Sequence, residues 1–233
     1  MRDVHAGGTA KRPFFADDEF ERIAQEELLG AGLLPSEPQA VRVERFIEKR
    51  FRVTPQYEAL TPGLLGYTEF GPEGVRAIIV SRDLSEDGAR VAERRINTTL
   101  AHEAGHGLLH THLFVLDSFP RDLFENAEDV GSTRILCRQE NEESVPRRKY
   151  DGRWWEVQAN RMMGALLLPR KLVGTALTDL MVARGALGAL VLPDDVREEA
   201  KHRLSDAFDV NPIVAQIRMN QLYPLADGHQ LTL

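Results

Sequence analysis

The spacing of apolar residues along the chain predicts many helices and one pair of strands. Between residues 41 and 51, for example, Val43, Phe46, Ile47 and Phe51 recur at helical spacing. By the same pattern, and from residues that start or stop helices, we expect helices over residues 17–29, 41–51, 89–112, 154–168, 171–183, 194–208 and 212–222. The chain is therefore expected to be an α+β protein in which helices dominate.

Two apolar stretches, residues 64–68 and 75–81, are expected to form strands, because residues 70–74 between them (Phe-Gly-Pro-Glu-Gly) have the composition of a hairpin turn. The run from Ala77 to Val80 is continuously apolar, as in strands that are buried on both faces. Residues 78–81 are compatible with two positions in a sheet. An edge strand would pair with an extended substrate backbone, whereas an interior strand would pair with neighbours on both sides.

The composition is that of a soluble protein, with 233 residues of which 42% are hydrophobic and 28% are charged. No apolar run approaches the length of a membrane-spanning helix, and the first residues lack the apolar core of a signal peptide. The single cysteine excludes an internal disulfide and favours a reducing compartment. These features predict a cytoplasmic protein that does not insert into membranes.

The formal net charge of -7 argues against nucleic acid as the main partner, because proteins are attracted to the phosphate backbone through clustered positive charge. A local basic patch on the C-terminal helices is the arrangement that would still permit DNA binding. A salt-dependent mobility shift with duplex DNA would detect it.

Residues His102-Glu103-Ala104-Gly105-His106 form an H-E-x-x-H motif within the helix expected over residues 89–112. Histidines four residues apart lie on one helical face, about 6 Å apart along the axis, and their imidazoles can bind one zinc ion. Glu103 can take a proton from a water whose pKa the metal lowers. The apolar flanks indicate a largely buried helix, in which unpartnered histidines and a glutamate would be costly. The motif is typical of zinc peptidases.

A catalytic zinc site needs a third protein ligand and an open position for water. In a continuous helix His110 would lie about 12 Å from His102 along the axis, which is too far to share the ion. His112 has the spacing of the third histidine in H-E-x-x-H-x-x-G-x-x-H proteases, but Leu109 stands where those proteins need a glycine. His112 is therefore the weaker alternative to a ligand from another helix.

Glu156 is the favoured third ligand. It lies four residues before Asn160 in the helix expected over residues 154–168, on a face that is otherwise apolar. Asn160 would hydrogen-bond a metal-binding histidine and fix its tautomer. The alternative is that Glu156 is a surface residue of an amphipathic helix, but an unpaired carboxylate on an apolar face would be destabilising.

The motif at residues 102–106 and the segment from Glu156 to Pro169 together resemble the ImmA/IrrE family of bacterial and phage metallopeptidases. The second signature of that family is a Glu-x-x-Ala-Asn/Asp helix that ends in an apolar run and a proline. The resemblance covers roughly residues 41–222. It implies a zincin-like fold of the gluzincin type, in which a small twisted sheet accompanies the H-E-x-x-H helix and the glutamate helix, followed by a C-terminal helical subdomain.

The resemblance also implies a division of the chain into three parts. They are a partly flexible N-terminal extension (1–40), a zincin-like metallopeptidase domain (41–185) with an insertion at about 113–153, and a C-terminal helical appendage (190–233). The insertion lengthens the interval between the two motifs and would shape or cover the substrate groove. Because no N-terminal DNA-binding domain is recognisable, the target protein is expected to be encoded separately.

The function implied by the resemblance is that of a regulatory endopeptidase that cleaves a helix-turn-helix repressor in stress or mobile-element control. One zinc ion per chain would be held by His102, His106 and Glu156, with water in the fourth position. Glu103 would act as general base and then as proton donor to the leaving amine. No residue that stabilises the tetrahedral oxyanion can be assigned from the sequence.

A second possible function is that of a metal-containing sensor or binding module, which would regulate a transcription factor by docking on it without proteolysis. Glu103 argues against this function, because a structural metal site has no use for a free carboxylate beside the metal. Arg94 and Arg95, which precede the motif, would either neutralise substrate carboxylates or form a solvated charged pair.

Overall fold

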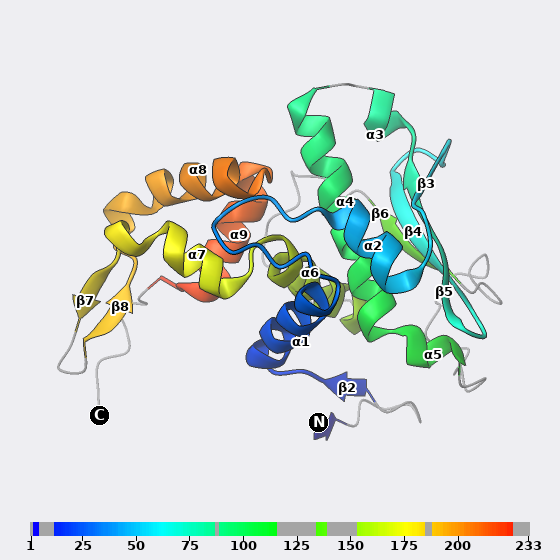
Figure 1. Cartoon of the computed structure of the whole chain (residues 1–233), viewed down its shortest axis with the longest axis horizontal. Helices are drawn as coiled ribbons and strands as arrows, with labels where there is room; N and C mark the ends of the chain where they lie inside the picture. Colours follow the sequence, from blue (N-terminus) through cyan, green and yellow to red (C-terminus); the bar gives the residue numbers. More distant parts are fainter. Residues whose placement is uncertain are drawn as a thin grey trace.

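A computed structural model describes residues 2–4, 12–86, 89–115, 134–138, 153–184 and 188–225 of the chain. It shows a mixed α and β protein, as expected. A small sheet lies on one side, and helices that include the C-terminal ones lie on the other (Figure 1). The long helix α4 (Arg90–Leu109) runs between them and packs against both the sheet and helix α6 (Trp154–Leu167). The residues of the H-E-x-x-H motif thus lie at the centre of the molecule.

The main sheet has four strands, in the order β3 (Gln56–Glu58), β5 (Gly74–Ser81), β4 (Leu64–Gly71) and β6 (Arg134–Arg138). Strand β3 is parallel to β5, and the other pairs are antiparallel. The hairpin expected between β4 and β5 is present. It closes at Gly74, whose φ of +113° is a conformation that other residues rarely adopt.

Strand β5 is an interior strand. Ile79 pairs with Gln56 of β3 on one side and with Tyr67 of β4 on the other. Ile78 and Val80 are fully buried, as a continuously apolar strand requires. The edge position considered for residues 78–81 is therefore wrong, because both hydrogen-bonding sides of the strand are already paired.

Strand β6 arises from the segment that the sequence analysis treats as an insertion, residues 113–153. It pairs with β4, with Leu136 opposite Tyr67. The same segment begins within the short helix α5 (Thr111–Val115). This part of the chain thus supplies one edge of the described sheet. Residues 138–153 are dense in charged side chains, which predicts an exposed loop, but they lie almost entirely outside the described residues.

Two helices precede the sheet and pack on the same core. Helix α1 (Asp17–Gly30) contacts α6, and α2 (Val43–Phe51) contacts α4. The buried faces of these two helices carry Phe20, Ala24, Leu28, Val43, Phe46 and Ile47. A single turn of helix, α3 (Asp83–Glu86), lies between strand β5 and helix α4 in the chain.

The C-terminal part combines helices with a small hairpin. It comprises α7 (Arg170–Ala176), the 3-10 turns η3 (Thr178–Leu180) and η4 (Asp194–Val196), strands β7 (Val182–Arg184) and β8 (Ala189–Val191), and helices α8 (Arg197–Phe208) and α9 (Pro212–Leu222). The helix predicted over residues 171–183 is therefore wrong beyond Ala176. The hydroxyls of Thr175 and Thr178 bond to carbonyls of the preceding turn, an arrangement that competes with regular helix.

The N-terminal and C-terminal regions share one core with the central part. The buried cluster includes residues of α1, α2, β5, α4, α6, α7, α8 and α9. The guanidinium of Arg218 on α9 donates to Glu21 of α1 at 2.7 and 2.8 Å and to the carbonyl of Leu168 at 3.0 Å. Helices α1 and α9 therefore pack as parts of the core, although they fall in the predicted extension and appendage. Residues 2–4 and 12–14, in the N-terminal extension that was expected to be partly flexible, pair as the short strands β1 and β2.

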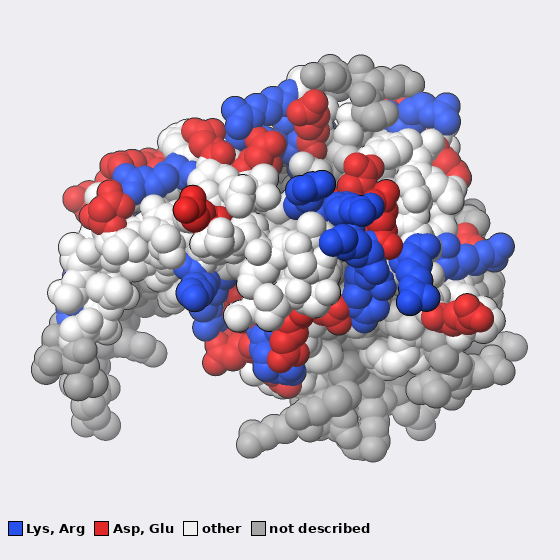
Figure 2. Space-filling view, in the orientation of Figure 1, with Lys and Arg blue, Asp and Glu red and all other residues white. Residues whose placement is uncertain are grey.

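Charged side chains of both signs are interspersed over the face drawn in Figure 2. Two basic side chains of α2 lie beside acidic partners: Arg45 pairs with Glu48, and Arg50 pairs with Glu27. Such pairing reduces the positive potential that would attract nucleic acid to this face. Among the described residues, no helix combines the length and the apolar character needed to cross a membrane.

Candidate metal centre

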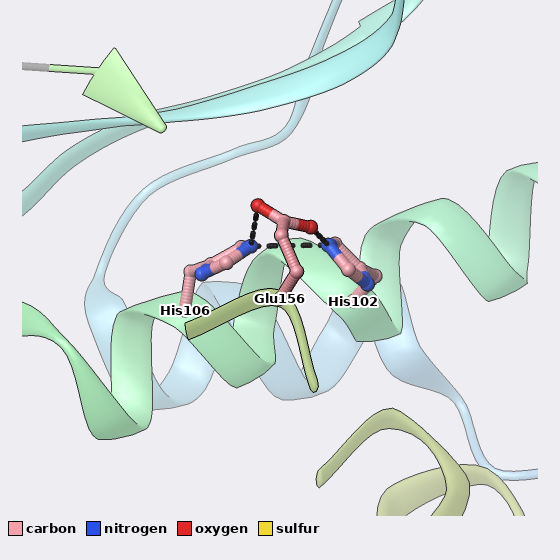
Figure 3. Close-up of side chains that lie close together, drawn as sticks. All are labelled: His102, His106 and Glu156. Carbon is pink, nitrogen blue, oxygen red and sulfur yellow. Dashed lines mark hydrogen bonds and ion pairs between the residues drawn. The ribbon is translucent and has the colours of Figure 1, made fainter. Parts of the chain in front are cut away.

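The H-E-x-x-H residues occupy the C-terminal half of α4, and all five are buried. His102 and His106 point from one face of α4 towards Glu156, which comes from the first turn of α6 (Figure 3). The Nε2 atoms of the two histidines lie 3.0 Å apart. The carboxylate oxygens of Glu156 lie 3.2 Å from His102 Nε2 and 3.6 Å from His106 Nε2.

These three residues form the group that could hold a metal ion in the described part of the chain, with ligand atoms all within 4.8 Å of one another. The structure thus brings together the three ligands proposed from the sequence. His112 lies on α5 and is not part of this group. His110 is not part of the group either, in agreement with the prediction that it lies too far from His102 along the helix axis to share an ion.

Close packing of α4 against α6 brings Glu156 to the histidines. A Cβ atom added at Gly105 would lie 3.0 Å from the carbonyl oxygen of Ala159 and 3.3 Å from the side chain of Met162. A residue larger than glycine would therefore push the two helices apart. Gly105 fills one of the two unspecified positions of the H-E-x-x-H motif, and its role is to permit this contact.

His102 is oriented by Asn160, as the sequence analysis expects. Its Nδ1 lies 3.0 Å from Asn160 Oδ1. An amide oxygen accepts hydrogen bonds only, so we assign the proton of the His102 ring to Nδ1. This tautomer leaves the Nε2 lone pair directed at the group formed with His106 and Glu156.

His106 has a different set of neighbours. Its Nδ1 lies 2.9 Å from Nδ1 of His110, and Nε2 of His110 lies 3.2 Å from Oε1 of Gln158 on α6. Burial lowers the pKa of His106 well below its usual value, and it lowers the pKa of His110 to about 3. Both rings are therefore neutral near pH 7. The sequence analysis missed these contacts, although residues 102, 106 and 110 share one helical face.

Glu103 follows His102 on α4 and contacts strand β4 through Thr68. The Thr68 hydroxyl donates to its Oε2 at 2.6 Å, whereas its Oε1 is buried and has no hydrogen-bond partner among the described residues. Burial raises the pKa of the Glu103 carboxyl to about 8, despite the opposing effects of His102 and Thr68. A buried carboxyl oxygen without a hydrogen-bond partner is costly, and a cation held by the neighbouring residues would lower this pKa and favour the carboxylate form that a base requires.

One side of the site is buried, and the other side is accessible to solvent. His106 and Glu103 are fully buried, whereas the side chain of Glu156 is 22% exposed and Asn160 lies on the exposed side of α6. A catalytic metal requires a position that water or substrate can reach. The accessible side of the group meets that requirement.

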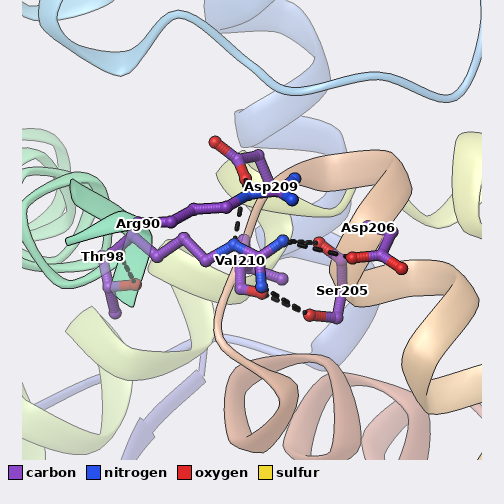
Figure 4. Close-up of polar contacts among 7 residues, drawn as sticks. Arg90, Thr98, Ser205, Asp206, Asp209 and Val210 are labelled. Carbon is purple, nitrogen blue, oxygen red and sulfur yellow. Dashed lines mark hydrogen bonds and ion pairs between the residues drawn. The ribbon is translucent and has the colours of Figure 1, made fainter. Parts of the chain in front are cut away.

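Arg94 belongs to a second polar cluster, nearer the start of α4. Its guanidinium donates to Asp209 Oδ1 at 2.9 Å, to Ser205 Oγ at 3.1 Å and to the Ser205 carbonyl at 3.2 Å. Arg90 also donates to Asp209, and the Ser205 hydroxyl donates to the Val210 carbonyl (Figure 4). Arg94 is buried, so both sequence-based interpretations of it, as a substrate contact and as a solvated charge, are wrong. Its hydrogen bonds connect α4 to the C-terminal end of α8.

Comparison with models of known protein families gives no match, and comparison with curated proteins gives none either. The chemistry of the residues themselves indicates whether a metal fits the site. Two imidazole nitrogens and a carboxylate suit zinc and also other divalent transition metals. Three electron-pair donors that face one another repel, and a cation between them removes that repulsion. The donor set and the unpartnered oxygen of Glu103 fit a catalytic metal with a bound water.

Proposed function

We propose that the protein is a zinc-dependent endopeptidase with a zincin-like fold, of the ImmA/IrrE type. One observation carries the proposal. His102, His106 and Glu156 converge from two helices, and the buried Glu103 lies beside them with one oxygen unpartnered. A structural metal site has no need of such a carboxylate, whereas peptide hydrolysis requires a base beside the metal.

A zinc ion held by these three residues would polarise the scissile carbonyl and lower the pKa of the attacking water. Glu103 accepts the proton of that water at Oε1, and the water oxygen forms a bond to the carbonyl carbon. Glu103 then delivers the proton to the amine nitrogen as the carbon–nitrogen bond breaks. Thr68 holds the other carboxylate oxygen at 2.6 Å and so limits the rotation of Glu103.

The proposed substrate is a helix-turn-helix repressor, and the proposed location is the cytoplasm. The substrate follows from the resemblance of the motifs at residues 102–106 and 156–169 to the ImmA/IrrE family, and the location follows from the single cysteine. The open side of the site, at Glu156 and Asn160, is where such a substrate would enter.

The test compares wild-type protein with the Glu103→Gln variant, both loaded with zinc, on a panel of purified helix-turn-helix repressors. Fragments with defined new termini, identified by mass spectrometry in the wild-type reaction and missing from the variant reaction, are the expected result. A stable complex without fragments would instead favour a metal-containing binding module. Equal fragments from both proteins would point to a contaminating protease and would remove Glu103 from the mechanism.

A further inference from the structure

His110 is a buried histidine that the proposed mechanism does not use. It follows the last residue of α4, and its backbone N–H still bonds to the carbonyl of His106. The ring of Trp154 packs edge-on against it, with ring centroids 5.6 Å apart. His110 is thus held between a metal-binding histidine of its own helix and two residues of α6, Trp154 and Gln158.

The hydrogen bonds of His110 permit one assignment that leaves His106 able to bind a metal. Only one proton can lie between the two Nδ1 atoms, which are 2.9 Å apart. If His106 holds that proton, its Nε2 carries a free lone pair. His110 then accepts at Nδ1, carries its own proton on Nε2 and donates it to Gln158 Oε1 at 3.2 Å.

The opposite assignment fits less well. If His110 held the shared proton, the proton of the neutral His106 ring would sit on Nε2, where it would point towards the other ligands and block the metal. Nε2 of His110 would then face the Gln158 oxygen without a proton, so that two acceptors would lie in contact. The amide oxygen of Gln158 therefore selects the first assignment.

We infer that His110 and Gln158 are positioning residues, which fix His106 in the tautomer with the proton on Nδ1 and so keep its Nε2 available to the metal. The inference rests on the metal site of the proposed function and not on peptide hydrolysis. It explains why a third histidine lies on the same face of α4, although it is too distant to be a ligand.

The two metal-binding histidines are oriented in different environments. Asn160, which orients His102, is on the exposed side of α6, where water can replace a lost side-chain acceptor. His110, which orients His106, is fully buried and covered by Trp154. Loss of the acceptor at His110 should therefore weaken metal binding more than loss of the acceptor at Asn160, because no water can restore the hydrogen bond.

The test measures zinc affinity by competition with a chromogenic chelator for wild type and four variants. His110→Phe keeps a ring against Trp154 but has no acceptor, and it should bind zinc about 10–100-fold more weakly. His110→Asn places an amide oxygen near the position of Nδ1 and should recover most of the affinity. Asn160→Ala should lose less than His110→Phe. His112→Ala, at an exposed histidine two residues along, should match wild type.

A second measurement does not depend on the variants folding. Long-range ¹H–¹⁵N correlation spectra of the wild-type protein, without metal, should show the proton of His106 on Nδ1. A proton on Nε2, or a zinc affinity of folded His110→Phe equal to that of wild type, would overturn the inference. If wild type binds no zinc, the proposed metal site fails, and the spectra still decide the tautomer of His106. If His110→Phe does not fold, Gln158→Met is used as the test variant instead, because it removes the side-chain oxygen that accepts the hydrogen bond of His110.

Discussion

Helix α4 carries two polar clusters with opposite hydrogen-bonding properties. Near its start, the buried guanidinium of Arg94 donates to acceptors on α8 and at its end, Ser205 and Asp209 among them. Near its end, the ligand atoms of His102, His106 and Glu156 face one another within 4.8 Å. In the first cluster donors meet acceptors. In the second, the tautomers assigned to His102 and His106 leave acceptors facing acceptors.

This difference separates a structural role from a functional one. A buried polar group that has its partners stabilises the packing of the elements that carry it. A buried group whose partner is missing lowers stability, unless a ligand supplies that partner. Arg94 thus serves to join α4 to the C-terminal helices, whereas the cluster at Glu103 is arranged for a ligand.

The Glu103→Gln substitution should have the largest effect. The amide keeps the shape of the side chain and can still accept a bond from Thr68, but it cannot take a proton from water. Peptide hydrolysis should therefore fall by about 10²–10⁴-fold, while the zinc content and the melting temperature are maintained or raised. Repressor cleavage and elemental analysis of the same samples measure both. Hydrolysis at the wild-type rate would contradict the role of Glu103.

The Arg94→Met substitution should affect stability and not the metal. Methionine fills the space but leaves the Ser205 hydroxyl and carbonyl without their donor and Asp209 with Arg90 alone, and losing hydrogen bonds to a buried charged group costs about 1.5–3 kcal/mol. Denaturant unfolding measures this loss, with Arg95→Met at the less buried neighbouring position as control. The folded variant should bind zinc as wild type does. A loss of zinc affinity in folded Arg94→Met would show that the two clusters are coupled.

The Gly105→Ala substitution should disturb both stability and metal binding to a smaller extent. Overpacking costs about 1–3 kcal/mol, partly offset by the higher helix propensity of alanine, about 1 kcal/mol. Because the added methyl group would press on Ala159, Glu156 should move away and zinc should bind more weakly. Gly164→Ala is the matched control, since a Cβ there meets its nearest neighbour, Arg218, at 3.4 Å. Equal zinc affinity in both variants would exclude the packing role of Gly105.

The Asp209→Asn substitution should have the smallest effect. Burial would raise the pKa of Asp209, but hydrogen bonds from Arg94 and Arg90 outweigh it and hold the pKa below its usual value. The folded state therefore binds fewer protons than the unfolded state, and stability is lost as the pH falls below about 4. Asparagine tolerates the left-handed conformation at this position, where φ is 50°.

The Asp209→Asn variant should accordingly lose roughly 0–1 kcal/mol at neutral pH, and its stability should change less between pH 5 and pH 3 than that of wild type. Thermal unfolding across this range provides the measurement. Identical pH profiles of the two proteins would show that Asp209 contributes nothing to acid unfolding.

The residues of the candidate metal site could be predicted from the sequence because the information is local. The four-residue interval between His102 and His106 places both on one helical face, and the same interval links Glu156 to Asn160. The β4–β5 hairpin could also be predicted from the sequence, because its turn residues lie between two apolar runs. In each case a few neighbouring residues determine the geometry.

The remaining features depend on contacts between distant segments. Strand β6 is five residues long and joins the sheet through β4, far away in the sequence. Arg94 finds its partners more than 100 residues later. His110 could be excluded as a ligand from the helical rise alone, but its contact with Gln158 depends on how α6 crosses α4. None of these contacts leaves a periodic signal in the chain.

The most direct test of the account is the zinc stoichiometry and coordination of the wild-type, Glu156→Ala and His112→Ala proteins, measured by elemental mass spectrometry and X-ray absorption. We predict one zinc ion per chain in wild type and in His112→Ala, with nitrogen and oxygen ligands at about 2.0–2.2 Å, and a strong loss of zinc in Glu156→Ala. Full zinc binding by Glu156→Ala, or its loss in His112→Ala, would contradict the site formed by His102, His106 and Glu156.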